Sequence, residues 1–288
     1  MKIFTDERCL SYGMAHHPEK PSRVRNSVRK LTNQRDIPIQ WLKPEPVDDD
    51  ILSRAHTREH IKRVRETKLD FAGDTPAYPD IFEHAMRSSA GAVRAMEAAR
   101  KGEIAFSLLR PPGHHAKKEE AMGFCYFNSV AVSVLEALAM GAKKVAVFDF
   151  DVHHGNGTEA ILVNHWHTAF FSVHQHPCYP GTGITDIGHN CFNFPVAPKS
   201  SRKQYRHVLT RSWLNLEKFK PDLVAVSAGF DAYRLDNIAQ ENLEPEDFYS
   251  VGAMIRRSGI PAYHVLEGGY SDDLPELILA YLKGVTDK

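Results

Sequence analysis

The chain has 288 residues, 42% of them apolar, and 36 basic side chains against 36 acidic ones. This balance leaves no overall field to attract nucleic acid or an anionic membrane, and the apolar content is enough for a large core. The N-terminus is too charged for a signal peptide and no run approaches the roughly 18 apolar residues of a membrane span, so we expect a soluble cytoplasmic protein with one domain over residues 1–288.

The predicted elements alternate between helices and strands. The N-terminal part is interrupted by prolines, and we interpret it as packing and rim loops, followed by an alanine-rich helix over Tyr78–Arg100. Apolar spacing predicts further helices at Ser129–Met140 and Ser200–Phe219. Short β-branched and aromatic runs predict strands at Ile104–Leu109, Val145–Phe150, Thr168–Val173, Leu223–Ser227 and Ala262–Leu266. This alternation is typical of an α/β fold, a parallel sheet covered by helices on both faces.

Polar side chains gather where the predicted strands end. In parallel sheets, ligands bind beyond the carboxyl ends of the strands. The five strand ends are followed by His114 and His115, by Asp149 to His153, by Ser172 and His174, by Asp231, and by Tyr270. We therefore expect one site at this edge of the sheet.

A metal site is predicted at the end of the second strand. In an extended chain Asp149, Asp151 and His153 point to one face, and three ionisable groups there are hard to bury without a cation. Asp231 adds a carboxylate to Asp151 and His153, which leaves a fourth position open, as in catalytic zinc sites. Carboxylates also suit iron(II) or manganese. A bound metal would lower the pKa of a water molecule towards about 7.

Two further motifs carry candidate catalytic groups. His114 and His115 stand on a Pro-Gly turn, where Asp149 and Asn156 are possible ring partners and one ring is a candidate general base. A plain surface loop is the alternative. Tyr270 follows two glycines and is a candidate donor to an oxyanion, or an ordinary core tyrosine. Phe124, next to Gly123, and Tyr179 either line a narrow slot or pack in the core.

Six motifs in this order resemble one known family. They are RPPGHHA, GFCYFN, DFDVHHGNGT, PGTG, SAGFDA and LEGGY, and the match as a whole runs from about Tyr12 to Tyr270. The chain is similar to the zinc-dependent histone deacetylases and to the bacterial amidohydrolases that resemble them. HGNGT and LEGGY resemble the class II branch.

The resemblance implies a three-layer, arginase-like fold around an eight-stranded parallel sheet. It implies zinc on Asp151, His153 and Asp231. His115 would be general base and acid, with Asn156 as its neutral partner, His114 would be held by Asp149, and Tyr270 would polarise the carbonyl. A structural potassium ion would bind Asp149, the Ser172 hydroxyl, and the backbone carbonyls of Asp151, His153 and Val173. Phe124, Tyr179 and Gly123 would line an acyl-lysine tunnel, with Asp74 at its rim. Arginases carry a second metal on Asp-x-Asp, but Tyr233 stands two residues after Asp231, so one metal and amide hydrolysis follow.

The expected activity is removal of acetyl or short acyl groups from lysine side chains. The first alternative is an acetylpolyamine amidohydrolase, in which an acidic rim residue would select a second amine. The aligned position is Ile238, which favours acyl-lysine, although Glu119, Glu120 or Glu241 remain candidates for the rim. The second alternative is a catalytically silent acyl-lysine binder, which a missing Tyr270 or a broken ligand set would indicate.

Overall fold

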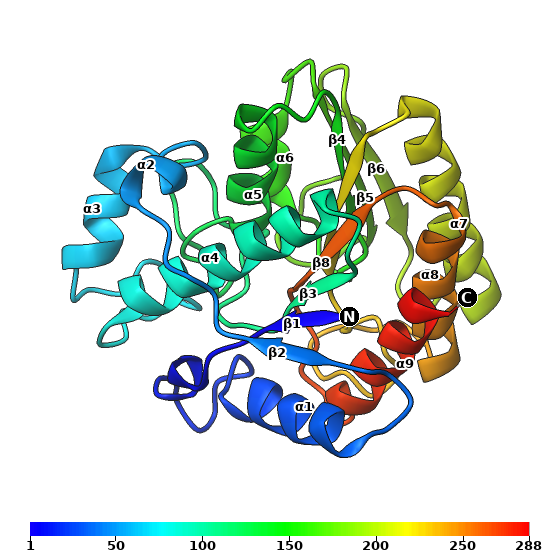
Figure 1. The fold of residues 1–288 in the computed structure, drawn as a ribbon, viewed down its shortest axis with the longest axis horizontal. Helices are drawn as coiled ribbons and strands as arrows, with labels where there is room; N and C mark the ends of the chain where they lie inside the picture. The colour runs from blue at the N-terminus through cyan, green and yellow to red at the C-terminus, as the bar shows by residue number, and fades with distance from the viewer. Residues whose placement is uncertain (288) are drawn as a thin grey trace.

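A computed structural model describes residues 1–287. Within them lies an eight-stranded sheet in the order β2-β1-β3-β8-β7-β4-β5-β6, and every neighbouring pair is parallel (Figure 1). The strands are β1 (Lys2–Phe4), β2 (Gln40–Leu42), β3 (Ala105–Ser107), β4 (Val145–Asp149), β5 (Thr168–Gln175), β6 (Cys191–Val196), β7 (Leu223–Ala228) and β8 (Ala262–Leu266). The expected α/β fold with a parallel eight-stranded sheet is confirmed.

Helices cover both faces of this sheet (Figure 1). One layer holds α1 (Ser22–Asn33), α7 (Arg202–Phe219), α8 (Pro245–Arg257) and α9 (Leu274–Thr286). The other holds α3 (Arg58–Glu66), α4 (Ile81–Arg100), α5 (Ser129–Ala139) and α6 (Asn156–Leu162). The 3-10 helix η1 (Glu7–Leu10) and α2 (Asp49–Leu52) lie near the edge of the fold. The result is a three-layer arrangement.

The central strands are mostly apolar because both of their faces are buried, and several of their polar residues stand near the carboxyl ends. In β4, Ala146 and Phe148 pack into the core under α7 to α9, whereas Val145 and Val147 pack into the core under α3 to α6. Side chains alternate between faces along a strand, so a strand buried on both sides is apolar along most of its length. The continuous apolar runs in the sequence have this cause.

Three strands were not predicted from the sequence. The N-terminal part is not only loops, because β1 and β2 extend the sheet at one edge. Each has three residues, too few to establish a period of two. The strand β6 contains Asn193 and Pro195, residues that are depleted in strands, and Pro195 is tolerated because β6 is an edge strand.

The helix predicted from Tyr78 begins three residues later, at Ile81. Pro79 disfavours a helical conformation at the residue before it, and Asp80 has a left-handed backbone with φ of 55°. Other helix starts follow their sequence signals. Asn128 accepts a hydrogen bond from the Ala131 N–H at the start of α5, and Ser201 accepts one from the Gln204 N–H at the start of α7.

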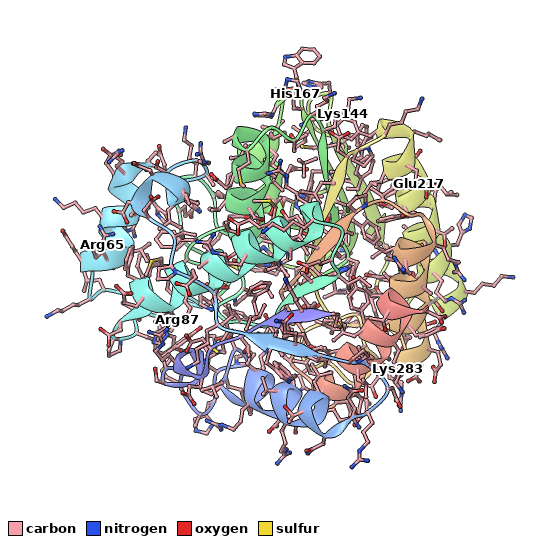
Figure 2. All side chains as sticks on the ribbon, viewed as in Figure 1. Arg65, Arg87, Lys144, His167, Glu217 and Lys283 are labelled. Carbon is pink, nitrogen blue, oxygen red and sulfur yellow. The ribbon has the colours of Figure 1, made fainter. Side chains whose placement is uncertain are left out.

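Charged side chains occupy the outer faces of the helical layers. Arg65, Glu217 and Lys283 come from α3, α7 and α9 and point away from the sheet (Figure 2). Across residues 1–287, no helix combines the length and the apolar character needed to cross a membrane.

Candidate active site

The carboxyl ends of the central strands surround a pocket of about 200 Å³. Every residue that was predicted to contact substrate lies in its wall, together with both neighbouring histidines and the tyrosine of the last motif. The wall consists of Asp74, Pro112, His114, His115, Gly123, Phe124, His153, Tyr179, Ile238 and Tyr270. Residues far apart in the chain therefore form one cavity at the predicted edge of the sheet.

The three predicted metal ligands lie together beside this pocket. Ligand atoms of Asp151, His153 and Asp231 are all within 4.8 Å of one another, and the three side chains are buried. His153 Nδ1 is 3.1 Å from Asp151 Oδ1 and 3.0 Å from Asp231 Oδ2. Two carboxylates and an imidazole form a ligand set that suits zinc or another divalent transition metal.

A bend in the backbone, rather than a continuous extended strand, brings these ligands together. The strand β4 ends at Asp149, and the chain then bends, so the argument from alternating faces was wrong beyond that residue. In the bend, the His153 N–H donates to Asp151 Oδ1 at 2.9 Å, and the Val152 N–H donates to Asp231 Oδ1 at 2.8 Å. These bonds orient both carboxylates. Asp149 does not belong to this group of ligands, and its side chain contacts His114 instead.

Glycines make room for the metal ligands. A Cβ atom at Gly268 would collide with the carboxylates of Asp151 and Asp231, and one at Gly229 would collide with Asp151. In addition, the Gly268 N–H donates to Asp151 Oδ2 at 2.7 Å. The two small residues therefore let backbone close around the carboxylates, a cradle that fits a buried metal ion.

The two adjacent histidines have the partners that the sequence suggested. His114 Nδ1 is 3.2 Å from Asp149 Oδ2, and His115 Nδ1 is 2.7 Å from Asn156 Oδ1. Burial opposes charge on His114, but the carboxylates of Asp151 and Asp149 prevail and raise its pKa to about 10. Burial, reinforced by the charge of His114, lowers the pKa of His115 well below its ordinary value. The two rings thus differ in protonation near neutral pH.

Tyr270 lines the same pocket as these two rings. It is 8% exposed, and its burial raises the pKa of the phenol well above 10, so its hydroxyl remains a donor. Phe124 and Tyr179 form aromatic walls: the Phe124 ring lies 5.7 Å from the Tyr270 ring, and the Tyr179 ring lies 5.0 Å from that of His115.

The family model described as "Histone deacetylase domain" matches residues 17–284. The chain belongs to the histone deacetylase family. Members of this family that resemble the chain include the histone deacetylase-like amidohydrolase of Pseudomonas aeruginosa, which is 36% identical over 282 residues, covering 90% of this chain and 73% of the relative. A protein named probable deacetylase from Methanothermobacter thermautotrophicus is 35% identical over 288 residues, covering 93% and 86%. With such relatives, this histone deacetylase family member is a hydrolase that acts on amides.

Solved structures have the same fold. The crystal structure of the HD domain of HDA15 has a TM-score of 0.92 and 32% identity, and covers 100% of this chain and 91% of its own. The acetylpolyamine aminohydrolase from Burkholderia pseudomallei has a TM-score of 0.91 at 24% identity, covering 100% and 99%, a likeness of fold.

The sequence of this deacetylase family member did not indicate two residues that support the site. Glu267 Oε2 accepts the N–H groups of Gly113 and His114, at 2.7 and 3.1 Å, and burial raises the pKa of this carboxyl to about 7. Arg23 donates to the Gly269 carbonyl at 2.7 Å, and its guanidinium lies 4.5 Å from the centroid of the Tyr270 ring. A carboxylate directly after the apolar end of the last strand was the available signal for Glu267.

The rim of the pocket has one carboxylate, that of Asp74. Its Oδ1 accepts the Gly123 N–H at 3.2 Å and the Thr75 hydroxyl at 2.8 Å. The three glutamates considered as rim residues do not line the pocket. Glu241 is buried elsewhere at 3% exposure, and Glu120 pairs with Lys117 at 2.8 Å. Glu119 is exposed.

Three of the residues assigned to potassium, Asp149, Ser172 and Val173, lie on the neighbouring strands β4 and β5, and Asp151 and His153 lie in the bend after β4. Ser172 is the register partner of Asp149, its Oγ is 2.9 Å from His174 Nδ1, and Val173 is buried beside it. Potassium binding stays a prediction.

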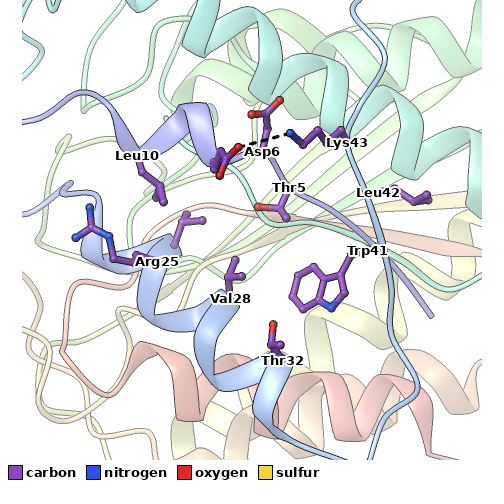
Figure 3. A pocket seen from close by; sticks show the side chains of 11 residues that line it. Thr5, Asp6, Leu10, Arg25, Val28, Thr32, Trp41, Leu42 and Lys43 are labelled. Carbon is purple, nitrogen blue, oxygen red and sulfur yellow. Dashed lines mark ion pairs between the residues drawn. The ribbon is translucent and has the colours of Figure 1, made fainter.

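A larger pocket, of about 460 Å³, lies apart from the site. Val28 of α1 and Trp41 of β2 form part of its wall (Figure 3). It contains none of the candidate site residues, so cavity size alone does not indicate the active site in this deacetylase fold.

Proposed function

We propose that the protein is a metal-dependent deacetylase that removes acetyl or short acyl groups from the lysine side chains of proteins. One observation carries the proposal. One pocket of about 200 Å³ is lined by the aromatic rings of Phe124 and Tyr179 and also by His115, Tyr270 and the ligand His153. An acyl-lysine side chain is long, thin and apolar up to its amide, which matches a channel with aromatic walls and polar groups at its base.

The proposed metal is zinc, with iron(II) as the alternative, held by Asp151, His153 and Asp231. When bound, it would polarise the substrate carbonyl and make a water molecule more acidic. We further propose a structural potassium ion near Asp149 and Ser172.

The proton transfers would fall to His115. Its Nδ1 is committed to Asn156, which leaves Nε2 to accept a proton from water and to return it to the leaving amine. The low pKa of the ring keeps it neutral and ready near pH 7. His114 would hold a positive charge against Asp149 and so disfavour a second imidazolium. The Tyr270 hydroxyl would donate to the oxyanion.

The substrate class depends on the rim. Ile238 offers an apolar surface to a lysine stem and no partner to a free ammonium, which favours peptides. The carboxylate of Asp74 is the observation that favours acetylpolyamines, since it lines the same pocket. The Gly123 N–H and the Thr75 hydroxyl occupy Asp74 Oδ1, so this oxygen shapes the loops, and we assign the other oxygen to a substrate backbone N–H.

A turnover panel tests the proposal. Metal-reconstituted protein is assayed against acetyl-lysine peptides, longer acyl-lysine peptides and N-acetylated putrescine and spermidine. We expect the highest kcat/KM on a lysine peptide. Faster turnover of every acetylpolyamine would replace the proposal by the polyamine alternative, and tight peptide binding without turnover would indicate a silent binder. The single domain over residues 1–288 and the cytoplasmic location stay predictions.

A further inference from the structure

Asp236 is a buried carboxylate that the proposed chemistry does not use. It lies in the loop after β7, five residues beyond Asp231, and is 7% exposed. Its Oδ2 accepts the backbone N–H of Tyr270 at 2.6 Å and that of Ser271 at 3.2 Å. Its Oδ1 accepts the N–H of Ile238 at 3.1 Å. Three backbone donors therefore converge on one side chain.

These bonds join two separate loops at the pocket. Ile238 follows β7 and Tyr270 follows β8, and both side chains line the same cavity from different loops. Hydrogen bonds to an ionised acceptor are shorter and stronger than neutral ones, so one carboxylate with three donors is a firm connection. The position of the phenol and the position of the rim wall are thus fixed by a common anchor.

The turn that carries Tyr270 needs such an anchor. Gly269 has φ of 114°, a conformation that side chains other than glycine rarely adopt. Arg23 holds the Gly269 carbonyl and Asp151 holds the Gly268 N–H, but these bonds precede Tyr270. Asp236 is the acceptor for the Tyr270 N–H itself. Without Asp236, these hydrogen bonds would hold the turn only before Tyr270, the residue that bears the hydroxyl.

We propose that Asp236 is a positioning residue that holds Tyr270 and Ile238 in one fixed relation across the pocket; the assignment rests on the proposed role of Tyr270. Both of its oxygens are occupied by backbone donors, and it does not line the pocket, so it acts through the residues it holds rather than on substrate. Displacing a reacting group by about 1 Å costs up to roughly 100-fold in rate.

A double-mutant cycle separates this role from a merely structural one. Asp236→Asn keeps the size but turns an amide NH₂ towards N–H donors. We expect it to lower kcat on an acetyl-lysine peptide by about 10- to 100-fold. In a Tyr270→Phe background the same substitution should cost less than about threefold, because the hydroxyl to be positioned is gone. Equal losses in both backgrounds would overturn the assignment.

The matched control is Asp222→Asn. Asp222 also accepts two backbone N–H groups, those of Lys143 and Lys144 at 2.8 and 2.9 Å, but at the opposite end of β4. Its replacement should leave kcat unchanged. Asp236→Ser, which retains a smaller acceptor, is the second variant should Asp236→Asn fail to fold. Loss of the fold in both would make Asp236 a general stability residue and would overturn the assignment.

Hydrogen exchange gives a readout that needs no substrate. In Asp236→Asn, the amides in segments 236–240 and 268–272 that Asp236 accepts, those of Ile238, Tyr270 and Ser271, should exchange about tenfold faster or more, since their carboxylate acceptor is lost, and Asp222→Asn should leave them unchanged. If the unmodified protein turns over no acylated amine, the proposed function fails, and exchange then decides on Asp236 alone. Unchanged exchange in these two segments would overturn the assignment.

Discussion

The Nδ1 atom of His115 lies 2.7 Å from the side-chain oxygen of Asn156, a neutral acceptor. An aspartate at position 156 would stabilise the imidazolium and raise the pKa of His115. A general base works only when unprotonated, so Asn156→Asp should move the acid limb of kcat/KM to higher pH by about one unit or more. Unmodified protein should keep its kcat/KM through pH 6. Matching pH profiles for the two proteins would contradict His115 as the base.

Removing one ligand of the metal group should remove the metal. Asp151, His153 and Asp231 are buried and share one small volume, so Asp231→Ala leaves a two-ligand set. We expect one zinc-class ion per chain by elemental analysis, its loss in the variant, and no turnover after chelation. Two tightly bound ions, or full activity in Asp231→Ala, would refute this prediction.

Tyr270→Phe tests the oxyanion donor. Loss of one such donor should lower kcat by about 10²- to 10³-fold with unchanged metal content. Because the ring and its contact with Arg23 are retained, the melting temperature should change little. A kcat close to that of the unmodified protein would show that Tyr270 is an ordinary core tyrosine and not an oxyanion donor.

Ile238→Glu tests the rim. A carboxylate there would give a free ammonium a partner, and an ion pair of about 1–2 kcal/mol corresponds to roughly tenfold or more in relative kcat/KM for acetylpolyamines over acetyl-lysine peptides. Ile238→Gln is the matched control, since it adds polarity without charge. An unchanged substrate ratio in Ile238→Glu would show that position 238 does not select between acetylpolyamines and acetyl-lysine peptides.

Glu241→Gln should stabilise the protein in a pH-dependent manner. Burial raises the pKa of Glu241 to about 8 from an ordinary 4.5, although the Ser200 backbone favours the carboxylate. Between these values the unfolded chain releases the proton and the folded chain keeps it, so the unmodified protein loses stability as pH rises, and the full loss is reached above about pH 8.

The melting temperature of Glu241→Gln, relative to the unmodified protein, should therefore rise from pH 5 to pH 9. A burial penalty of about 1–3 kcal/mol corresponds to roughly 3–10 °C at this chain length. Glu120→Gln, at an exposed ion pair, should show no such trend. A constant difference across this pH range for Glu241→Gln would contradict the buried ionisation.

The amino-acid sequence by itself predicted the residues of the candidate site. Asp151, His153 and Asp231, the His114–His115 pair and Tyr270 were identified because ionisable residues at apolar strand ends have few other uses. The strand β8 was predicted with its observed bounds. Local signals suffice for such features, since a strand buried on both faces is mostly apolar and ligands bind beyond the carboxyl ends of parallel strands.

Only the tertiary structure decided which groups hold the site in place. Glu267 is 154 positions from Gly113, Arg23 is 246 positions from Gly269, and Asp236 is 34 positions from Tyr270. The strands β1 and β2 were likewise not predicted from the sequence, because three residues are too few to show the two-residue alternation of a strand. A hydrogen bond between distant segments leaves no pattern in one sequence. In each of these bonds one partner is a backbone N–H or C=O group, which nearly every residue has, and only folding brings the side chain to it.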